Sequence, residues 1–309
     1  GILRAYEHGT NDFNPRGKLH LRGVGKHTSS SHNNGEFHGS TLKYVGAPAS
    51  EPVFQFGPDN LDRGDSPTPV PTQGQRIEGM NLYGETQKGV PLVQASENAQ
   101  FNSIKELYIV QEGDGDGMLV KDLWVSEVEN IAVVQSNPGT NAGRRAPHER
   151  EGVGFQVANE VLFAGVSLVE NVTASGFRYG NVAGGLQRFN LGANVNVTFH
   201  GTQASRCTYG HVAGGSTRSI IFDNTYSEFC NAGGYHFFNQ PRLTEVRTPH
   251  NSSSPENYRG EFCIGINDEG TQVSPGKTNV QIKGTVDSVG TATVDGTTYP
   301  TIVDGTRSF

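Results

Sequence analysis

A repeated segment in the middle of the chain constrains the fold more than any other feature. Residues 170–185 and 200–215 match at eight of sixteen positions, and both contain the motif Tyr-Gly-x-Val-Ala-Gly-Gly, which begins at Tyr179 and again at Tyr209. A fainter third copy occupies residues 227–234. Repeats of this length are the signature of architectures in which similar units stack on one another. We therefore expect a fold built by stacking.

Short strands of the form Φ-x-Φ, where Φ is an apolar residue, recur along most of the chain. Examples end at Leu82, Ile109, Leu168 and Phe222, and a second short strand often follows each of them. Such alternation is typical of strands with one buried face. Helical periodicity is nearly absent, and the segments between strands are short and rich in Gly, Asn and Ser, which argues against βαβ crossovers. The pattern predicts an all-β fold, a parallel β-helix.

The composition agrees with this prediction. The 309 residues include 41 Gly and 15 Pro, while the hydrophobic residues make up only 34%. Glycine and asparagine suit sharp corners that require positive φ, and a narrow core needs few large apolar side chains. Cys207 and Cys230, which form no Cys-x-x-Cys pair, are expected to stack as free, buried thiols.

The two ends of the chain differ from its body. From Gly284 the sequence changes to short segments rich in Thr, Val, Gly and Asp, with hairpin turns expected at 295–296 and 304–305. We expect residues 1–283 to form the β-helix body and residues 284–309 a hairpin that caps it or contacts other subunits of a trimer. The chain opens without Met or a charged and apolar leader, so we expect an N-terminal portion to be missing.

Charge and hydropathy disfavour two classes of partner. The net charge is -7, which is the wrong sign for a protein that binds nucleic acid by releasing counterions from phosphates. No apolar run approaches the ~18 residues that a membrane span requires. We expect neither a nucleic-acid partner nor membrane insertion.

Four segments near the N-terminus carry a resemblance to a known family. The stretches LHLRGVGK at 19–26, TLKYVG at 41–46, PVFQFG at 52–57 and QRIEGMNLYG at 75–84 resemble the opening rungs of pectate-lyase-like β-helix proteins, and phage tailspikes and polysaccharide depolymerases look most similar. The resemblance implies a right-handed, single-stranded parallel β-helix.

This resemblance also implies a function. It suggests a homotrimer on a virion tail, in contact with other tail proteins, that binds a bacterial surface polysaccharide and in one version depolymerises it. Two alternatives stay open. One is a structural virion or adhesin module without catalysis, and the other is a secreted, extracellular polysaccharide lyase of the pectate-lyase type.

The candidate catalytic residues come from aligning successive strands. Alignment of the strands that end near residues 170, 200 and 223 places Val169, His200 and Asp223 in one outward row, with Glu170 beside it. A Glu and an Asp can act as general acid and base or nucleophile on a glycosidic bond, and a His beside a carboxylate can abstract a sugar proton in a lyase. The alternative is a row of polar residues on a solvated face.

Substrate binding is predicted at aromatic and basic residues. Trp124 and Tyr108 each lie between two apolar residues, so both are expected to point outward as a platform for sugar rings. Burial under a loop or in a subunit interface is the alternative for both. Arg144 and Arg145 lie in the long loop 136–152 and could hold an acidic sugar, or lie on its solvated face.

An acidic segment is the candidate metal site. Glu112, Asp114 and Asp116 alternate with glycines between two predicted strands. Closely spaced carboxylates can wrap Ca²⁺, which takes six to eight oxygen ligands. An exposed acidic corner without an ion is the alternative, and no other cofactor is expected.

Overall fold

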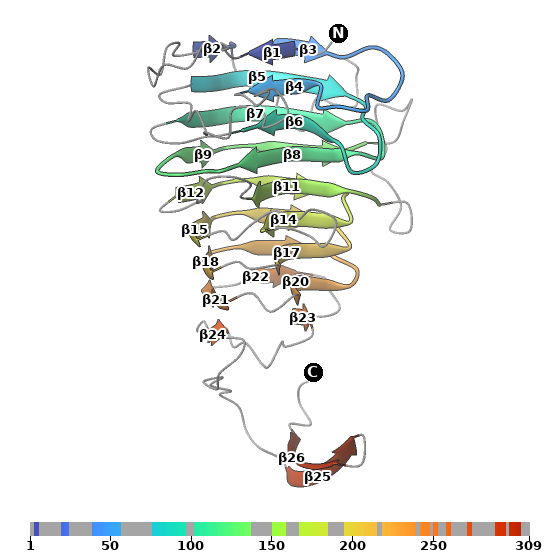
Figure 1. Cartoon of the computed structure of the whole chain (residues 1–309), viewed down its shortest axis with the longest axis vertical. Helices are drawn as coiled ribbons and strands as arrows, with labels where there is room; N and C mark the ends of the chain where they lie inside the picture. The colour runs from blue at the N-terminus through green and yellow to red at the C-terminus, as the bar shows by residue number, and fades with distance from the viewer. Residues whose placement is uncertain are drawn as a thin grey trace, which may run out of the picture.

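The structure is a computed structural model, and every regular element in the part of the chain that it describes is a β-strand (Figure 1). The described residues are 3–5, 20–24, 39–56, 76–96, 102–136, 150–158, 167–184, 195–214, 218–238, 242–247, 250–252, 258–260, 271–273, 288–294 and 297–303. The predicted binding residues Arg144 and Arg145 lie outside these ranges.

Most strands lie parallel to one another in three stacks, and successive passes of the chain contribute one strand to each stack. The first stack begins at β2 and ends at β21, and it includes the first halves of the long strands β5 and β7. At its end, β24 pairs with β21 in the antiparallel direction. Its strands are β2 (His20–Arg22), β5 (Arg76–Gly84), β7 (Ser103–Gln111), β9 (Glu127–Glu129), β12 (Ser167–Glu170), β15 (Val195–His200), β18 (Arg218–Asp223), β21 (Arg242–Arg247) and β24 (Thr271–Val273).

The second and third stacks repeat this arrangement. The second stack contains the second halves of β5 and β7 with β3 (Ser40–Lys43), β10 (Ala132–Gln135), β13 (Thr173–Ser175), β16 (Gln203–Ser205), β19 (Tyr226–Glu228) and β22 (His250–Ser252). The third stack, a nine-stranded sheet, contains β1 (Leu3–Ala5), β4 (Phe54–Phe56), β6 (Pro91–Ala95), β8 (Asp116–Lys121), β11 (Val153–Ala158), β14 (Tyr179–Ala183), β17 (Tyr209–Gly214), β20 (Gly233–Phe238) and β23 (Tyr258–Gly260). The prediction of an all-β fold with parallel strands is confirmed.

The core lies between the three stacks and is built from rows of apolar side chains in register. Each parallel strand of the first stack contributes one residue to the longest row, because alternate side chains point to opposite faces of a strand. In register order the row is Leu21, Ile77, Ile104, Val128, Val169, Phe199, Phe222 and Val246. All of them except the partly buried Leu21 are fully buried. The predicted Φ-x-Φ strands that end at Leu82, Ile109 and Phe222 therefore supply core residues, whereas the prediction for Leu168 was wrong, because Leu168 is exposed and Val169 lies in the core instead.

The corner between the first and second stacks explains the asparagines of the sequence. Asn130, Asn171 and Asn224 follow β9, β12 and β18 with φ between 49° and 56°, and Gly201 follows β15 with φ of 60°. Asparagine and glycine tolerate this left-handed conformation better than other residues. The predicted use of Gly and Asn at corners is confirmed here.

The glycine in each copy of the Tyr-Gly motif is required by close contact between passes. A Cβ atom added to Gly180 would lie 2.4 Å from the carbonyl oxygen of Gly210, and one added to Gly210 would lie 2.5 Å from the carbonyl oxygen of Gly234. Tyr179 and Tyr209 pair in register, so the two glycines lie one above the other. Any larger residue would push adjacent strands apart, because the nearest atom that it meets belongs to the backbone.

Other side chains of the repeat also stack. The rings of Tyr179 and Tyr209 are 5.5 Å apart and nearly parallel, and Arg178 lies over the Tyr179 ring. Cys207 and Cys230 are both fully buried free thiols at equivalent points of successive passes, as predicted. Burial raises the pKa of the Cys207 thiol.

The C-terminal part of the chain contains a separate antiparallel pair. Strands β25 (Ser288–Val294) and β26 (Thr297–Val303) pair with Val294 opposite Thr297, and neither joins the larger sheets in the described part of the chain. This pairing is the one expected of a hairpin there, although the predicted turns at 295–296 and 304–305 both lie outside the described residues. No helix among the described residues is long and apolar enough to cross a membrane.

Candidate functional site

One continuous row of polar residues runs along the outer face of the first stack. Each member directly follows a residue of the buried core row, so strand alternation turns it to the opposite face. In register order the row is Arg22, Glu78, Lys105, Glu129, Glu170, His200 and Asp223. We call this set the polar row. It extends along seven neighbouring strands, and on the next strand Arg247 pairs in register with Asp223.

The polar row brings together the three predicted catalytic residues. Glu170 pairs with His200, and His200 pairs with Asp223, so they occupy successive strands β12, β15 and β18. The predicted alignment was wrong by one residue in β12, because it placed Val169 in the row and Glu170 beside it. Val169 is instead fully buried in register with Phe199. Core packing fixes this register, since a slip by one residue would expose Val169 and bury a carboxylate.

His200 is held by its neighbour in the row. Its Nδ1 atom lies 3.0 Å from Oδ2 of Asp223, and the two side chains are 41% and 31% exposed. Backbone hydrogen bonds at the corner fix both strand ends, because the N–H of Asn171 donates to the His200 carbonyl and that of Gly201 donates to the Asp223 carbonyl. The contact through Nδ1 leaves Nε2 as the ring nitrogen available to a ligand.

Glu170 lies on the other side of His200. Its side chain is half-buried, and no partner of its carboxylate is found among the described residues. Neighbouring strands of a sheet are about 4.8 Å apart, so the backbones that carry Glu170 and Asp223 are roughly 9.6 Å apart. An imidazole flanked by two carboxylates can exchange protons with a ligand lying along the row.

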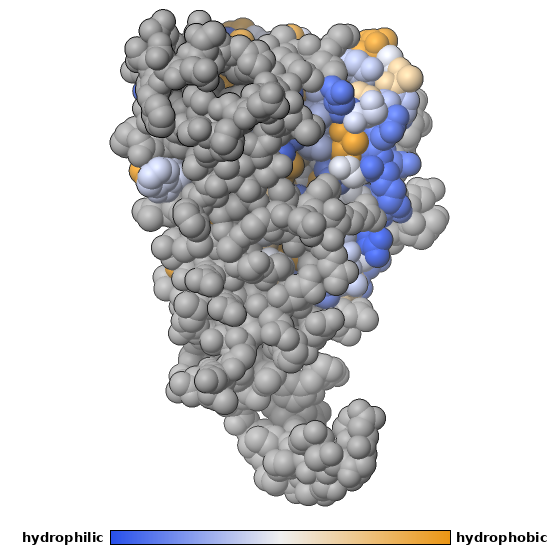
Figure 2. Space-filling view, viewed as in Figure 1, coloured by the Kyte–Doolittle hydropathy of each residue, from blue (hydrophilic) through white to orange (hydrophobic). Residues whose placement is uncertain are grey.

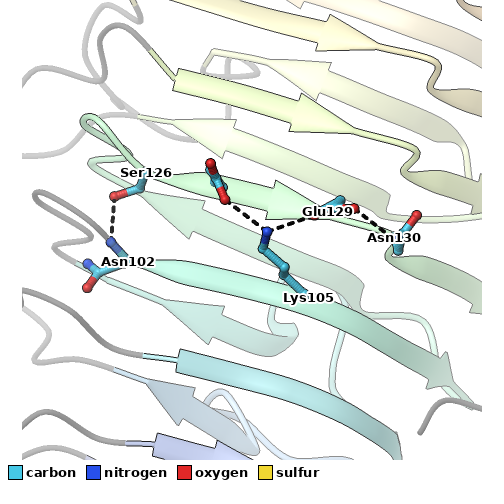
Figure 3. Close-up of polar contacts among 6 residues, drawn as sticks. Asn102, Lys105, Ser126, Glu129 and Asn130 are labelled. Carbon is cyan, nitrogen blue, oxygen red and sulfur yellow. Dashed lines mark hydrogen bonds and ion pairs between the residues drawn. The ribbon is translucent and has the colours of Figure 1, made fainter.

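On the N-terminal side of Glu170 the polar row continues into a clamp, in which two glutamates hold a lysine (Figure 3). The Nζ atom of Lys105 lies 2.9 Å from Oε2 of Glu127 and 2.8 Å from Oε2 of Glu129. The side-chain amide of Asn130 donates to the other oxygen of Glu129. The hydrogen bonds from Lys105 to Glu129 and Glu127 raise the pKa of Lys105, and the one to Glu129 has the larger effect. Sequence reasoning missed Lys105, Glu127 and Glu129, although each adjoins an apolar residue of a short strand.

The predicted aromatic platform is not formed. Trp124 is 39% exposed in the connection between β8 and β9, but Tyr108 is buried. The Tyr108 ring lies 6.3 Å from that of Tyr83 in a cluster on the outer face of the second stack, where Val110 also packs. Tyr108 does point away from the core row, so the predicted direction holds and the predicted exposure does not. The alternative of burial holds for Tyr108.

The predicted calcium ligands do not converge. Glu112 forms an ion pair with Lys43 at 3.0 Å, and Oδ1 of the buried Asp116 accepts a hydrogen bond from the backbone N–H of Val153. Asp114 is exposed. In the described part of the chain, no group of three His, Cys, Asp or Glu side chains is placed to hold a metal ion. The segment is an acidic corner between β7 and β8.

Comparison with protein-family models and with curated proteins finds no match to this chain.

Proposed function

We propose that the chain is a right-handed, single-stranded parallel β-helix of the phage tailspike type. Three parallel stacks to which each pass contributes one strand, with a core of in-register apolar rows, support this fold. The resemblance of the four N-terminal segments to tailspike rungs supports the family. In this proposal the protein works as a homotrimer on a virion tail, with other tail proteins as its neighbours.

We propose further that the outer face of the first stack binds a bacterial surface polysaccharide. The observation that carries this proposal is the polar row, in which Glu170, His200 and Asp223 lie in register on successive strands. A linear polymer can follow such a row, because polar groups repeat at the spacing of the strands. Sugar hydroxyls donate hydrogen bonds to carboxylates and accept them from an imidazole N–H.

The same residues are suited to cleaving a glycosidic bond. Inverting glycosidases place their two carboxyl groups about 6.5–9.5 Å apart, with water between one carboxylate and the sugar. The backbone separation of Glu170 and Asp223, roughly 9.6 Å, lies just above that range. One carboxyl group would donate its proton to the leaving oxygen, and the other would accept a proton from the attacking water. In a lyase, the contact between His200 and Asp223 would instead orient the imidazole so that Nε2 acts as the base.

Incubation of the protein with a panel of bacterial capsules and lipopolysaccharides tests both binding and cleavage. Binding is measured by pull-down, hydrolysis by new reducing ends, and elimination by absorbance of the unsaturated product. For a hydrolase, Glu170→Gln and Asp223→Asn should each lower release about 100-fold or more, in keeping with the usual contribution of general acid and base groups. For a lyase, His200→Ala should do so.

Glu228→Gln is the matched control, because Glu228 is a half-buried carboxylate on the second stack. It should leave release unchanged, and urea unfolding should show that all four variants are folded. Binding without release would identify the adhesin alternative. No binding to any glycan of the panel would overturn the proposal. Light scattering tests the trimer.

A further inference from the structure

The face proposed to bind glycan has a distinct chemical character between β9 and β18. A second row runs beside the polar row, two residues earlier in each strand and about 6.6 Å away. We call it the flanking row, and its members are Glu127, Leu168, Thr198 and Ile221. Leu168 is 38% exposed, while Thr198 and Ile221 are half-buried. The face therefore offers two apolar side chains, Leu168 and Ile221, beside a strip of hydrogen-bonding groups.

Negative charge dominates this face. Four carboxylates point outward from β9, β12 and β18, and they belong to Glu127, Glu129, Glu170 and Asp223. On the N-terminal side, Lys105 is shared by Glu127 and Glu129, and on the other side Arg247 pairs in register with Asp223. His200 lies against Asp223. Glu170 lies in register between Glu129 and His200. A polyanion on this face would therefore meet like charge at Glu170, and like charges brought together at a binding surface cost several kcal/mol.

An exposed tryptophan borders the flanking row and is held by an unusual backbone. Val125 has φ of 46°, which is costly for a β-branched residue, and its side chain is 37% exposed. The hydroxyl of Ser126 donates to the Trp124 carbonyl, and the hydroxyl of Ser167, next to Leu168, donates to the carbonyl that precedes Trp124. These contacts fix the Trp124 backbone beside the flanking row.

Together these features define the ligand class, and the inference rests on the glycan-binding function proposed above. We propose that the polysaccharide on this face is uncharged. The C–H faces of neutral sugar rings fit Trp124 and Leu168, while their hydroxyls can donate to the carboxylates of the polar row. Large hydrophobic residues exposed elsewhere are scattered among hydrophilic ones, as the visible flank in Figure 2 shows.

An uncharged ligand also decides between the two kinds of cleavage. Elimination removes the proton beside the carboxylate of a uronic acid, and the developing charge on that carboxylate needs a cation. A neutral sugar carries no such carboxylate, so it offers no proton that is acidic enough for elimination. Hydrolysis instead adds water across the glycosidic bond, with one proton leaving water and one reaching the leaving oxygen, and needs no such cation. Cleavage on this face is therefore hydrolytic.

The test compares neutral polysaccharides with uronic acid polysaccharides, the latter before and after chemical reduction of their carboxyl groups. The protein should bind members of the neutral or carboxyl-reduced set, with an affinity that changes less than about twofold between about 50 and 300 mM NaCl. Trp124→Ala and Leu168→Ala should each weaken binding up to about tenfold. Val45→Ala, which alters an 85% exposed valine outside the first stack, is the control and should have no effect.

The outcomes separate this inference from the function on which it rests. Binding that is strongest to an unreduced uronic acid polysaccharide and weakens in salt would overturn the inference while leaving glycan binding intact. Unsaturated products would do the same. Binding to neutral glycan that is insensitive to both substitutions would place the ligand on another face and also overturn it. Absence of binding to any polysaccharide would overturn the glycan-binding function itself.

Discussion

His200 and His211 belong to the same pass of the chain, yet they lie in opposite environments. His200 ends β15 on the outer face of the first stack, partly exposed and 3.0 Å from a carboxylate oxygen of Asp223. His211 lies in β17 and is fully buried. Its ring stacks on Tyr235 at 5.3 Å, and its hydrogen-bond partners include the hydroxyls of Thr202 and Ser227.

The difference shows how strand alternation decides what a histidine can do. The ring of His200 has the carboxylate of Asp223 as its partner and leaves Nε2 available, which suits proton exchange with a ligand. The inner ring has neutral partners and no solvent, so burial lowers the pKa of His211 to about 3. We infer that the interior should dominate stability and the outer face should dominate ligand chemistry. The following predictions test that division.

The largest expected effect is acid destabilisation through His211. An unfolded histidine has a pKa of about 6.5, so below that pH the unfolded state binds a proton that the folded state excludes. The contribution of His211 to the free energy of unfolding is therefore fully present above about pH 6.5. It falls as the pH drops, and the loss reaches about 4 kcal/mol at pH 3. Urea unfolding of the wild type and of His211→Gln between pH 7 and 4 measures it.

The matched control is His200→Gln on the outer face. It should retain the acid destabilisation of the wild type, because His211 is still present. In His211→Gln the pH dependence should be shallower, even if the starting stability is lower. Equal slopes in the wild type and His211→Gln would show that another group causes the acid sensitivity.

A smaller effect is expected at the glycine contacts between passes. Gly210→Ala would place a Cβ atom 2.5 Å from the backbone oxygen of Gly234 and 2.7 Å from Oγ of Ser227. Overpacking of this kind costs about 1–3 kcal/mol. Denaturant midpoints should therefore fall clearly, without loss of secondary structure by circular dichroism.

Gly89→Ala provides the comparison for that substitution. Gly89 has φ of 79°, but an added Cβ would meet no atom within 4 Å. Gly89→Ala should therefore destabilise the fold only because alanine disfavours a positive φ, by about 1 kcal/mol. If Gly89→Ala destabilised the protein more than Gly210→Ala, close contact between passes would not explain the repeated glycine.

Much of the fold could be predicted because its signals are local and repeated. The buried residues at Ile77, Ile104 and Phe222 recur at each strand, and the Tyr-Gly repeat predicted stacking in register at Tyr179 and Tyr209. These signals depend on alternation and spacing, both of which are visible in a single sequence.

The site was harder to predict because it depends on register and on what covers each side chain. A one-residue uncertainty at β12 decided whether Val169 or Glu170 joined His200, and only core packing settles it. Tyr108 has the alternation of an outward residue, yet it is buried beside Tyr83. The lysine clamp escaped notice because Lys105 and Glu129 come from different passes, and nothing local links them.

The smallest effect on stability is expected at the charged outer face, where Lys105 forms ion pairs with Glu127 and Glu129. Lys105→Met removes both ion pairs of Lys105, but pairs this close to solvent contribute less than about 1 kcal/mol. The loss should shrink further at high salt, which screens exposed charges. Lys43→Met, which removes the comparable pair with Glu112, is the control and should behave alike. Urea midpoints at about 50 and 500 mM NaCl measure both.

A salt-independent loss of more than about 2 kcal/mol for Lys105→Met alone would mean that the clamp stabilises the fold. Carboxylates with that role would be committed to Lys105 and unable to receive the hydroxyls of a sugar, so the division between interior and outer face would fail.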